Sequence, residues 1–330
     1  MKVIVTFSGG KDSLAALLWV RNNLTKDFIT VFCDTGWEHP LTYQYINEIT
    51  HKLNLNLVTL RSKKYNGMID MSMKKKRFPS MGKRYCTQEL KIVPTTDYLL
   101  DVVKDDFIVI QGIRAAESPN RAKMAAQCNY FKYYLEPIET NTALLPKLLE
   151  RLNSKMKASR RTELIERIGK IKNRLELGKE DPKFRSYRRK EILSFAKTHA
   201  TDIWRPVFDW SAQQVIDYIL DNGLEPNPLY RMGFKRVGCF PCIMSSLPEI
   251  YQILQRFPNR IAGIARYEQE CKSSFLGPGK IPRKYYKGAY PLITDVARYV
   301  KEEYARGTLF DETEGTSSFS CMSYYAGVCE

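Results

Sequence analysis

Histidine is scarce in this sequence of 330 residues, which contains only His39, His51 and His199. None of the three lies in a recognisable catalytic motif, so acid–base catalysis by histidine is a poor expectation. The sequence also lacks an apolar run long enough to cross a bilayer, and its first residues lead into a strand pattern rather than a signal peptide. We therefore expect a cytoplasmic protein without a membrane partner.

A structural disulfide framework is not expected either, although the chain has eight cysteines. A chain of this length can bury a core without covalent cross-links. In a cytoplasmic protein, several cysteines indicate metal or redox chemistry instead.

The glycine-rich segment at residues 8–13 has the spacing of neither the Walker A motif nor the Rossmann G-x-G-x-x-G motif. It lies between a strand pattern at residues 3–7 and a helical pattern at residues 14–20. Glycines let backbone N–H groups approach an anion, the helix start adds its dipole, and a lysine adds a full charge. The segment therefore predicts a phosphate-binding turn made of Ser8, Gly9, Gly10, Lys11, Asp12 and Ser13.

Short apolar runs typical of strands alternate with helical patterns, and they recur at residues 3–7, 28–33, 57–60 and 107–111. This alternation predicts an α/β fold with a doubly wound, Rossmann-like parallel sheet. A further strand is expected at residues 202–205. We expect a nucleotide-binding core at residues 1–137, a basic helical insertion at 138–200, the end of the α/β core at 201–230, and a mainly helical, cysteine-containing region at 231–330.

Polar residues follow three of the expected strands. In doubly wound sheets, ligands bind at the carboxyl ends of the strands, near the point where the strand order reverses. The loops after these strands should therefore form one nucleotide pocket, in which the phosphate turn is joined by Asp34, Thr35, Gly112 and Arg114.

Cations near the same strand ends are expected to contact phosphate or an acidic substrate, because arginine suits bidentate recognition of phosphate. Alternatively, any of them is a structural ion-pair partner of Glu89 or Glu117. The expected contacts are Arg84, Lys91, Arg114 and Arg121, with Glu117 and Ser118 in the same loop.

Positive charge is concentrated in one part of the chain. The net charge is +16, and residues 147–190 contain sixteen Lys or Arg against six Asp or Glu, which supplies +10 of it. Leucine and isoleucine recur there at helical spacing, so the stretch predicts a helical hairpin with cationic polar faces. We expect it to bind DNA or RNA, and the alternative is a solvated surface.

Two groups of cysteines stand out by their surroundings. Cys239 and Cys242 form a C-x-x-C motif, a spacing that brings two thiolates to one metal or cluster. Cys86 lies in a segment with basic neighbours that ends at Pro94. Cys33 and Cys128 are expected to be buried and inert.

Taken together, these motifs resemble the phosphoadenosine phosphosulfate (PAPS) reductase family within the PP-loop, or adenine nucleotide alpha-hydrolase, superfamily, whose core is of the HUP type. The resemblance rests on residues 8–13, 34–36, 86–94, 112–121 and 239–242, and it covers most of the chain outside the basic stretch. It implies a nucleotide-binding α/β core and sulfur metabolism.

The resemblance also implies a [4Fe–4S] cluster on Cys86, Cys239 and Cys242. Tyr85 stands where the family usually has a second adjacent cysteine, so the fourth ligand is open. Cys271 is the candidate, with Cys321 or Cys329 behind it, and an open iron position is another option. Zinc on the same thiolates is the alternative metal.

Two reactions fit such a site. In the first, the enzyme binds ATP with Mg²⁺, cleaves it between the α and β phosphates, and transfers sulfur to the activated acceptor. Lys11 would stabilise the charge that leaves on pyrophosphate, and Asp12 or Asp34 would position the ion. In the second, a thiolate attacks PAPS or adenosine phosphosulfate (APS), and a thioredoxin-like reductant completes the release of sulfite.

The intact phosphate turn favours ATP, because a sulfonucleotide has no β-phosphate to hold. The expectation is therefore an ATP-dependent sulfurtransferase that modifies DNA or RNA and uses a sulfur donor. A PAPS or APS reductase is the alternative, and a nucleic-acid-binding protein gated by nucleotide is the third hypothesis.

Overall fold

The computed structural model describes residues 1–80, 82–136, 140–179 and 187–307. Its central feature is a six-stranded sheet in the order β3-β2-β1-β4-β6-β5. The strands are β1 (Lys2–Thr6), β2 (Ile29–Cys33), β3 (Asn56–Leu60), β4 (Phe107–Ile110), β5 (Gln127–Asn129) and β6 (Thr201–Trp204).

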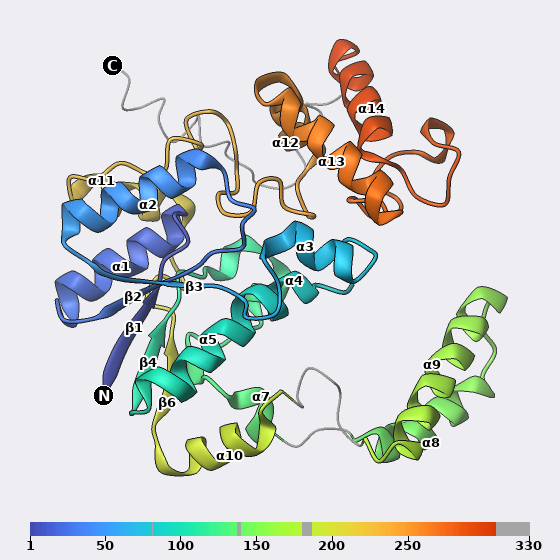
Figure 1. Cartoon of the computed structure of the whole chain (residues 1–330), viewed down its shortest axis with the longest axis horizontal. Coiled ribbons are helices and arrows are strands. Elements are labelled where there is room, and N and C mark those ends of the chain that lie inside the picture. The colour runs from blue at the N-terminus through green and yellow to red at the C-terminus, as the bar shows by residue number, and fades with distance from the viewer. Residues whose placement is uncertain (81, 137–139, 180–186, 308–330) are drawn as a thin grey trace. The chain divides into compact units, whose positions relative to one another are not determined.

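The helices of the core and of the C-terminal region follow the strands in chain order (Figure 1). Two short π-helical segments, Gln88–Ile92 and Leu99–Val103, flank α5, and 3₁₀ turns occur at Ala115–Glu117 and Arg283–Tyr285. The α-helices of this part are α1 (Lys11–Asn23), α2 (Pro40–Leu53), α3 (Gly67–Lys74), α4 (Tyr85–Thr87), α5 (Val93–Tyr98), α6 (Pro119–Ala122), α11 (Ala212–Asp221), α12 (Leu247–Arg256), α13 (Pro258–Cys271) and α14 (Ile293–Ala305).

The expected doubly wound sheet is confirmed. Strand β1 pairs in parallel with β2 on one side and with β4 on the other, and β2 pairs in parallel with β3. The chain therefore reverses its direction of winding between β3 and β4. That reversal brings the loops after β1 and β4 together at the carboxyl edge of the sheet, where such folds bind ligands. The short strand β5 was not expected from the sequence.

One face of the sheet is covered by α1, α2 and α11 (Figure 1). Leu14 and Leu17 of α1, Ile46 of α2 and Ile219 of α11 are buried in one cluster with the side chains of β1 and β2. Burial of aliphatic side chains contributes roughly 1.5–3 kcal/mol each. Helix α11 begins at the Ser211 cap, whose hydroxyl accepts a hydrogen bond from the amide of Gln214. This packing fixes the start of α1 against the sheet.

A second core is built by the C-terminal helices. Helices α12, α13 and α14 pack against one another and bury Ile250, Ile264 and Val296. The cluster also takes in Trp37, from the loop after β2, and the cysteine-bearing segments. Residues far apart in the sequence thus share one apolar interior next to the sheet edge.

Residues 129–201 form a separate compact unit. In it, the expected hairpin pairs α8 with α9 through leucine and isoleucine side chains, among them Leu148, Leu164 and Ile168. Most of the lysines and arginines on α9 are exposed. The helices of this unit are α7 (Lys132–Leu135), α8 (Asn141–Leu152), α9 (Ala158–Glu176) and α10 (Arg189–Thr198). None of the helices in the described part of the chain is long and apolar enough to cross a membrane.

Candidate nucleotide and thiol site

The phosphate turn lies between β1 and α1. Gly9 has a φ of +74°, and a Cβ there would lie 2.9 Å from Cγ2 of Thr42, so only glycine fits without strain. Ser13 closes the turn, because its hydroxyl donates to the carbonyl of Gly10 at 2.8 Å and accepts from the amide of Ser8 at 3.2 Å. Among the described residues, the amides of Gly9, Gly10 and Asp12 have no hydrogen-bond partner. The turn therefore presents N–H groups and a helix start to an anion.

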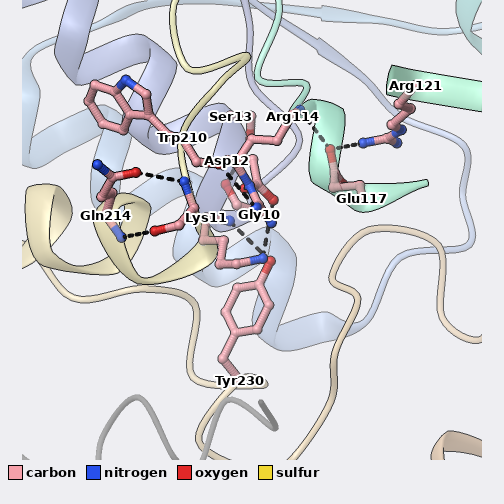
Figure 2. A network of polar contacts seen from close by, with 11 residues as sticks. Gly10, Lys11, Asp12, Ser13, Arg114, Glu117, Arg121, Trp210, Gln214 and Tyr230 are labelled. Carbon is pink, nitrogen blue, oxygen red and sulfur yellow. Dashed lines mark hydrogen bonds and ion pairs between the residues drawn. The ribbon is translucent and has the colours of Figure 1, made fainter. Parts of the chain in front are cut away.

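Lys11 and Asp12 begin helix α1 and are held by neighbours from two other segments (Figure 2). The Lys11 ammonium lies 3.2 Å from Oδ2 of Asp12, and Nε of Arg114 lies 2.5 Å from Oδ1. Burial alone would raise the pKa of Asp12, but the charges of Lys11 and Arg114 outweigh burial and lower it. Asp12 is thus an anion clamped between two cations.

The loop after β4 touches the start of α1 directly through Gly112. A Cβ at this position would lie 2.2 Å from the carbonyl oxygen of Asp12 and 2.4 Å from Cα of Ser13. Gly112, expected to bind nucleotide, lets two backbones approach so that Arg114 can reach Asp12.

The rest of this loop is fixed by its own ion pair. The Arg114 guanidinium also donates to the carbonyl of Trp210 at 3.4 Å, while the Arg114 amide donates to Glu117 at 2.9 Å. Arg121 pairs with Glu117 (Figure 2), and the Ser118 hydroxyl caps α6. Arg114 therefore pairs with Asp12 rather than with Glu117, which was the alternative partner considered from the sequence.

The loop after β2 is organised around two buried carboxylates. Asp34 accepts from Tyr43 at 2.7 Å, from the Gly36 amide at 2.9 Å and from Nε of Arg61 at 2.8 Å. Burial opposes ionisation, but these hydrogen bonds, led by that of Tyr43, lower the pKa of Asp34. The oxygens of Asp12 and Asp34 are thus engaged within the protein in this arrangement, and their expected role in positioning Mg²⁺ stays a prediction.

Glu38 is the second carboxylate, and it links this loop to the C-x-x-C motif. It accepts from the Thr35 hydroxyl at 2.6 Å and from the amides of Thr35 and Trp37. Its backbone forms an antiparallel bridge with Cys239, and the Thr35 hydroxyl lies 3.7 Å from Sγ of Cys239. The first thiol of the motif therefore lies against the nucleotide-side loop.

Further bonds fasten the C-x-x-C loop to Trp37. The Phe240 amide donates to the Trp37 carbonyl at 2.8 Å, and the Trp37 indole donates to the Pro241 carbonyl at 2.8 Å. Arg260 of α13 donates to the carbonyls of both Phe240 and Trp37 and stacks on the Trp37 ring at 3.6 Å. The position of the thiols relative to the sheet edge is thus set by several independent contacts.

The electrostatics of the thiols centre on Lys91, which lies on the π-helical segment after α4. The pKa of Lys91 is raised chiefly by Cys239, against the effect of burial, and Glu38 and Cys33 add to the rise. Burial raises the pKa of Cys239 to about 11 even though Lys91 opposes it. Lys91, expected to bind substrate, therefore faces the thiols, and π-helical turns are frequent at functional sites.

The four expected metal ligands lie in one core cluster but do not form a close set. Burial, followed by the proximity of Cys242, raises the pKa of Cys86, so these two thiols are neighbours. Cys271 is buried in the same cluster, and its thiol lies 3.3 Å from the carbonyl of Ser72. Within the described residues, no three His, Cys, Asp or Glu side chains are arranged to hold a single metal ion. Cys321 and Cys329 lie outside the described residues.

Arg84 lies apart from these contacts. It is exposed, and its guanidinium reaches the hydroxyl of Thr87 at 3.4 Å. Glu89, the ion-pair partner considered for it, pairs with Lys75 at 3.0 Å instead. Arg84 is therefore available to a ligand at the edge of the cysteine segment.

Sequence reasoning missed the role of the loop at residues 226–230. Nδ2 of Asn227 donates to the Gly9 carbonyl at 3.2 Å, and the Tyr230 hydroxyl accepts from the Lys11 amide at 3.1 Å. Lys11 Nζ also lies 5.2 Å from the centre of the Tyr230 ring. The one signal in the sequence was Asn227, which lies between two prolines. An asparagine side chain is costly to bury unless it is hydrogen-bonded.

The family model described as "Phosphoadenosine phosphosulfate reductase domain" matches residues 2–130 and 140–245. The chain belongs to this family. The matched residues include the phosphate turn, the loops after β2 and β4, Cys86 and the C-x-x-C motif. The resemblance is therefore confirmed at the level of the PAPS reductase family.

Relatives of this PAPS reductase-family chain are found in viruses and archaea. An uncharacterized protein of Escherichia phage 186 is 26% identical over 99% of this chain and 96% of its own length. An uncharacterized protein of Methanocaldococcus jannaschii is 26% identical over 78% of the chain but only 39% of its own length. An adenosine 5'-phosphosulfate reductase of Neisseria meningitidis is 51% identical over 53 residues, 15% of the chain and 22% of that enzyme. Among solved structures, the PAPS reductase of Candida auris matches 73% of the chain and 83% of its own, at 14% identity and a TM-score of 0.41.

Proposed function

We propose that this protein binds ATP at the phosphate turn, cleaves it between the α and β phosphates, and transfers sulfur to an acceptor, which we take to be DNA or RNA. The observation that carries the proposal is the link from the phosphate turn to a thiol. The turn, the Thr35 loop and Cys239 lie along one edge of the sheet, and Thr35 lies 3.7 Å from the thiol. A nucleotide and a sulfur atom can thus meet at one place.

The preference for ATP rests on the intact turn. Lys11 is buried and anchored by Asp12, and unpaired amides surround the start of α1. Such preorganised donors stabilise charge that develops on a leaving pyrophosphate, an effect worth roughly 3–4 kcal/mol for a single donor in other enzymes. A sulfonucleotide without a β-phosphate would leave these donors without a partner.

The reaction has two steps. First, an acceptor oxygen attacks the α-phosphorus, the bond to the bridging oxygen breaks, and pyrophosphate leaves. Second, a sulfide ion attacks the activated carbon, the bond from that carbon to the acceptor oxygen breaks, and AMP leaves with this oxygen. Lys11 and the turn amides serve the first step, and Arg114 acts as a positioning residue because it holds Asp12.

A cysteine-bound metal group is part of the proposal. Cys86, Cys239 and Cys242 would hold it, with Cys271 as the fourth ligand. The described thiols belong to one core cluster, and the sulfur chemistry of the family is the reason to prefer an iron–sulfur cluster over zinc. A cluster supplies a site at which sulfur or electrons can be held.

The choice of DNA or RNA as the acceptor rests on the positive charge of the α8–α9 hairpin. The hairpin of α8 and α9 buries its apolar faces internally and leaves most of the cations of these two helices exposed. A long polyanion suits such a surface. We therefore assign the hairpin a role in holding DNA or RNA.

The test is anaerobic incubation of the purified protein with γ-labelled ATP and DNA or RNA. Labelled pyrophosphate should appear, the nucleic acid should stimulate it, and Lys11→Ala should abolish it. Lys26→Ala, an exposed lysine beyond the other end of α1, is the matched control and should behave as wild type. Unchanged ATP together with sulfite from PAPS or APS would refute the proposal.

That refuting result is the signature of the second candidate, a sulfonucleotide reductase. The observation that favours it is the 51% identity to the Neisseria meningitidis APS reductase over 53 residues. It would require a thioredoxin-like reductant and a reactive cysteine. Sulfite release that depends on thioredoxin would establish it.

A further inference from the structure

A cavity of about 1060 Å³ opens at the C-terminal helices, and its lining includes none of the phosphate-turn or C-x-x-C residues. The end of α13, residues 284–290 and the first turns of α14 form its walls. Ligand sites commonly occupy about 300–1000 Å³. The cavity is therefore large enough for a ligand, and the proposed reaction leaves it unused.

The segment that forms one wall is cationic and aromatic. Residues 280–290 contain four Lys or Arg, three Tyr and no Asp or Glu. Lys284 and Lys287 are exposed, and so is 53% of Tyr290. All three line the cavity, and the Lys284 ammonium lies 5.3 Å from the centre of the Tyr285 ring.

The wall behind them is rigid. Glu268 is buried and accepts hydrogen bonds from the amides of Phe275 at 2.7 Å and Ile293 at 2.8 Å, so it joins α13 to the start of α14. Tyr285 packs on Tyr299 with 4.7 Å between the ring centroids. The exposed residues thus stand on a fixed support.

Acidic residues line the opposite side, but other groups neutralise them. Asp295 accepts from the Leu292 amide at 3.0 Å and lies 3.4 Å from Arg298. Glu302 lies 3.6 Å from Arg306. The positive charge that remains for a ligand is that of Lys284 and Lys287, with exposed Lys272 on the same lining.

We propose that this cavity binds single-stranded nucleic acid, with an unpaired base stacked on Tyr290 and backbone phosphates held by Lys284 and Lys287. Aromatic rings set among cations are how proteins hold unpaired strands, because every base has a face to stack and every nucleotide a charge. An acidic peptide would use the lysines but not the exposed ring. The inference deepens the proposed function, since it supplies a place for the acceptor strand, but its test needs no ATP.

The experiment measures the anisotropy of labelled oligothymidylate and oligouridylate of about 15 nucleotides as full-length protein is added without nucleotide. Tyr290→Ala should weaken binding about 5- to 100-fold, and Tyr290→Phe should retain it. The double variant Lys284→Ala/Lys287→Ala should lower the slope of log affinity against log salt by about 1.4. Lys301→Ala, an exposed lysine of α14 outside the cavity lining, is the control for charge and should match wild type.

Several results would overturn the inference: no binding of either oligonucleotide, equal binding by Tyr290→Ala and wild type, or equally tight binding of a duplex that offers no unpaired bases. Comparison of the two oligonucleotides tells DNA from RNA. If oligonucleotide binding fails while ATP is still cleaved, the cavity assignment falls and the proposed reaction stands. Binding that depends on Tyr290, without any ATP cleavage, supports the cavity and removes the reaction.

Discussion

Replacing Arg114 with alanine tests how the site is held together. The Arg114 and Asp12 side chains are 6% and 14% exposed, and Nε lies 2.5 Å from Oδ1. Loss of one partner of a buried ion pair costs about 3–5 kcal/mol, because the remaining charge stays buried. Since Lys11 still lies 3.2 Å from Asp12, we expect the lower end, a loss of about 3 kcal/mol in the free energy of unfolding.

The effect should depend on pH in a defined direction. In the native protein the pKa of Asp12 is lowered, so the pair stabilises the fold above the ordinary carboxyl pKa of 3.8 and is lost as pH falls through the folded value. Without Arg114, burial raises the pKa of Asp12, and protonation then relieves the uncompensated charge. The destabilisation by Arg114→Ala should therefore be largest near neutral pH and shrink towards acid pH.

Urea denaturation of wild type, Arg114→Ala, Asp12→Asn and the double variant measures the coupling. Arg121→Ala is the matched control, because its pair with Glu117 is partly exposed, and it should cost less than about 1 kcal/mol. Additive effects of the Asp12 and Arg114 changes, or a loss by Arg114→Ala no greater than that by Arg121→Ala, would show that the pair does not hold the site.

Two further predictions concern the backbone and a buried acid. Gly112→Ala places a Cβ against the backbone of Asp12 and should destabilise the protein by about 3 kcal/mol or weaken ATP binding, whereas Gly263→Ala, with open space in α13, should be neutral or slightly stabilising. Burial raises the pKa of Glu268 from its ordinary 4.5 to about 7. The protonated carboxyl of Glu268 therefore contributes its full stabilisation below about pH 4.5, and this stabilisation is lost as pH rises through 7. Urea unfolding at a series of pH values should show that the advantage of wild type over Glu268→Gln in free energy of unfolding falls by about 3 kcal/mol over this range. Parallel curves for the two proteins would contradict this.

The fold could be predicted because its signals are local. Apolar runs of strand length and helical periodicity both act over a few residues, and each predicted the observed elements. Strand β5 was missed because three residues, Gln127–Asn129, carry no periodicity, and only pairing at the sheet edge makes them a strand.

The phosphate turn was predictable for the same reason, but its partners were not. Tyr230 and Lys11 are separated by 219 residues, and Arg114 and Asp12 by 102. A sequence shows that arginine suits phosphate, but not that this guanidinium is already bound to a carboxylate. The sequence likewise could not show that Gly112 lies directly against the backbone of Asp12 and Ser13.

Each of the three carboxylates of the site is bound by neighbouring groups of the protein. Asp12 is held by two cations, Asp34 by an arginine and a tyrosine, and Glu38 by amides and hydroxyls of its own loop. These neighbours balance the negative charge of the carboxylates, so a polyphosphate bound at the turn would meet the Lys11 ammonium and unpaired amides without facing a free carboxylate. In the proposed reaction, a divalent ion would then be held mainly by the phosphates of the nucleotide and would keep its water ligands. The turn would receive an anion that gains charge during that reaction, as pyrophosphate does when it leaves.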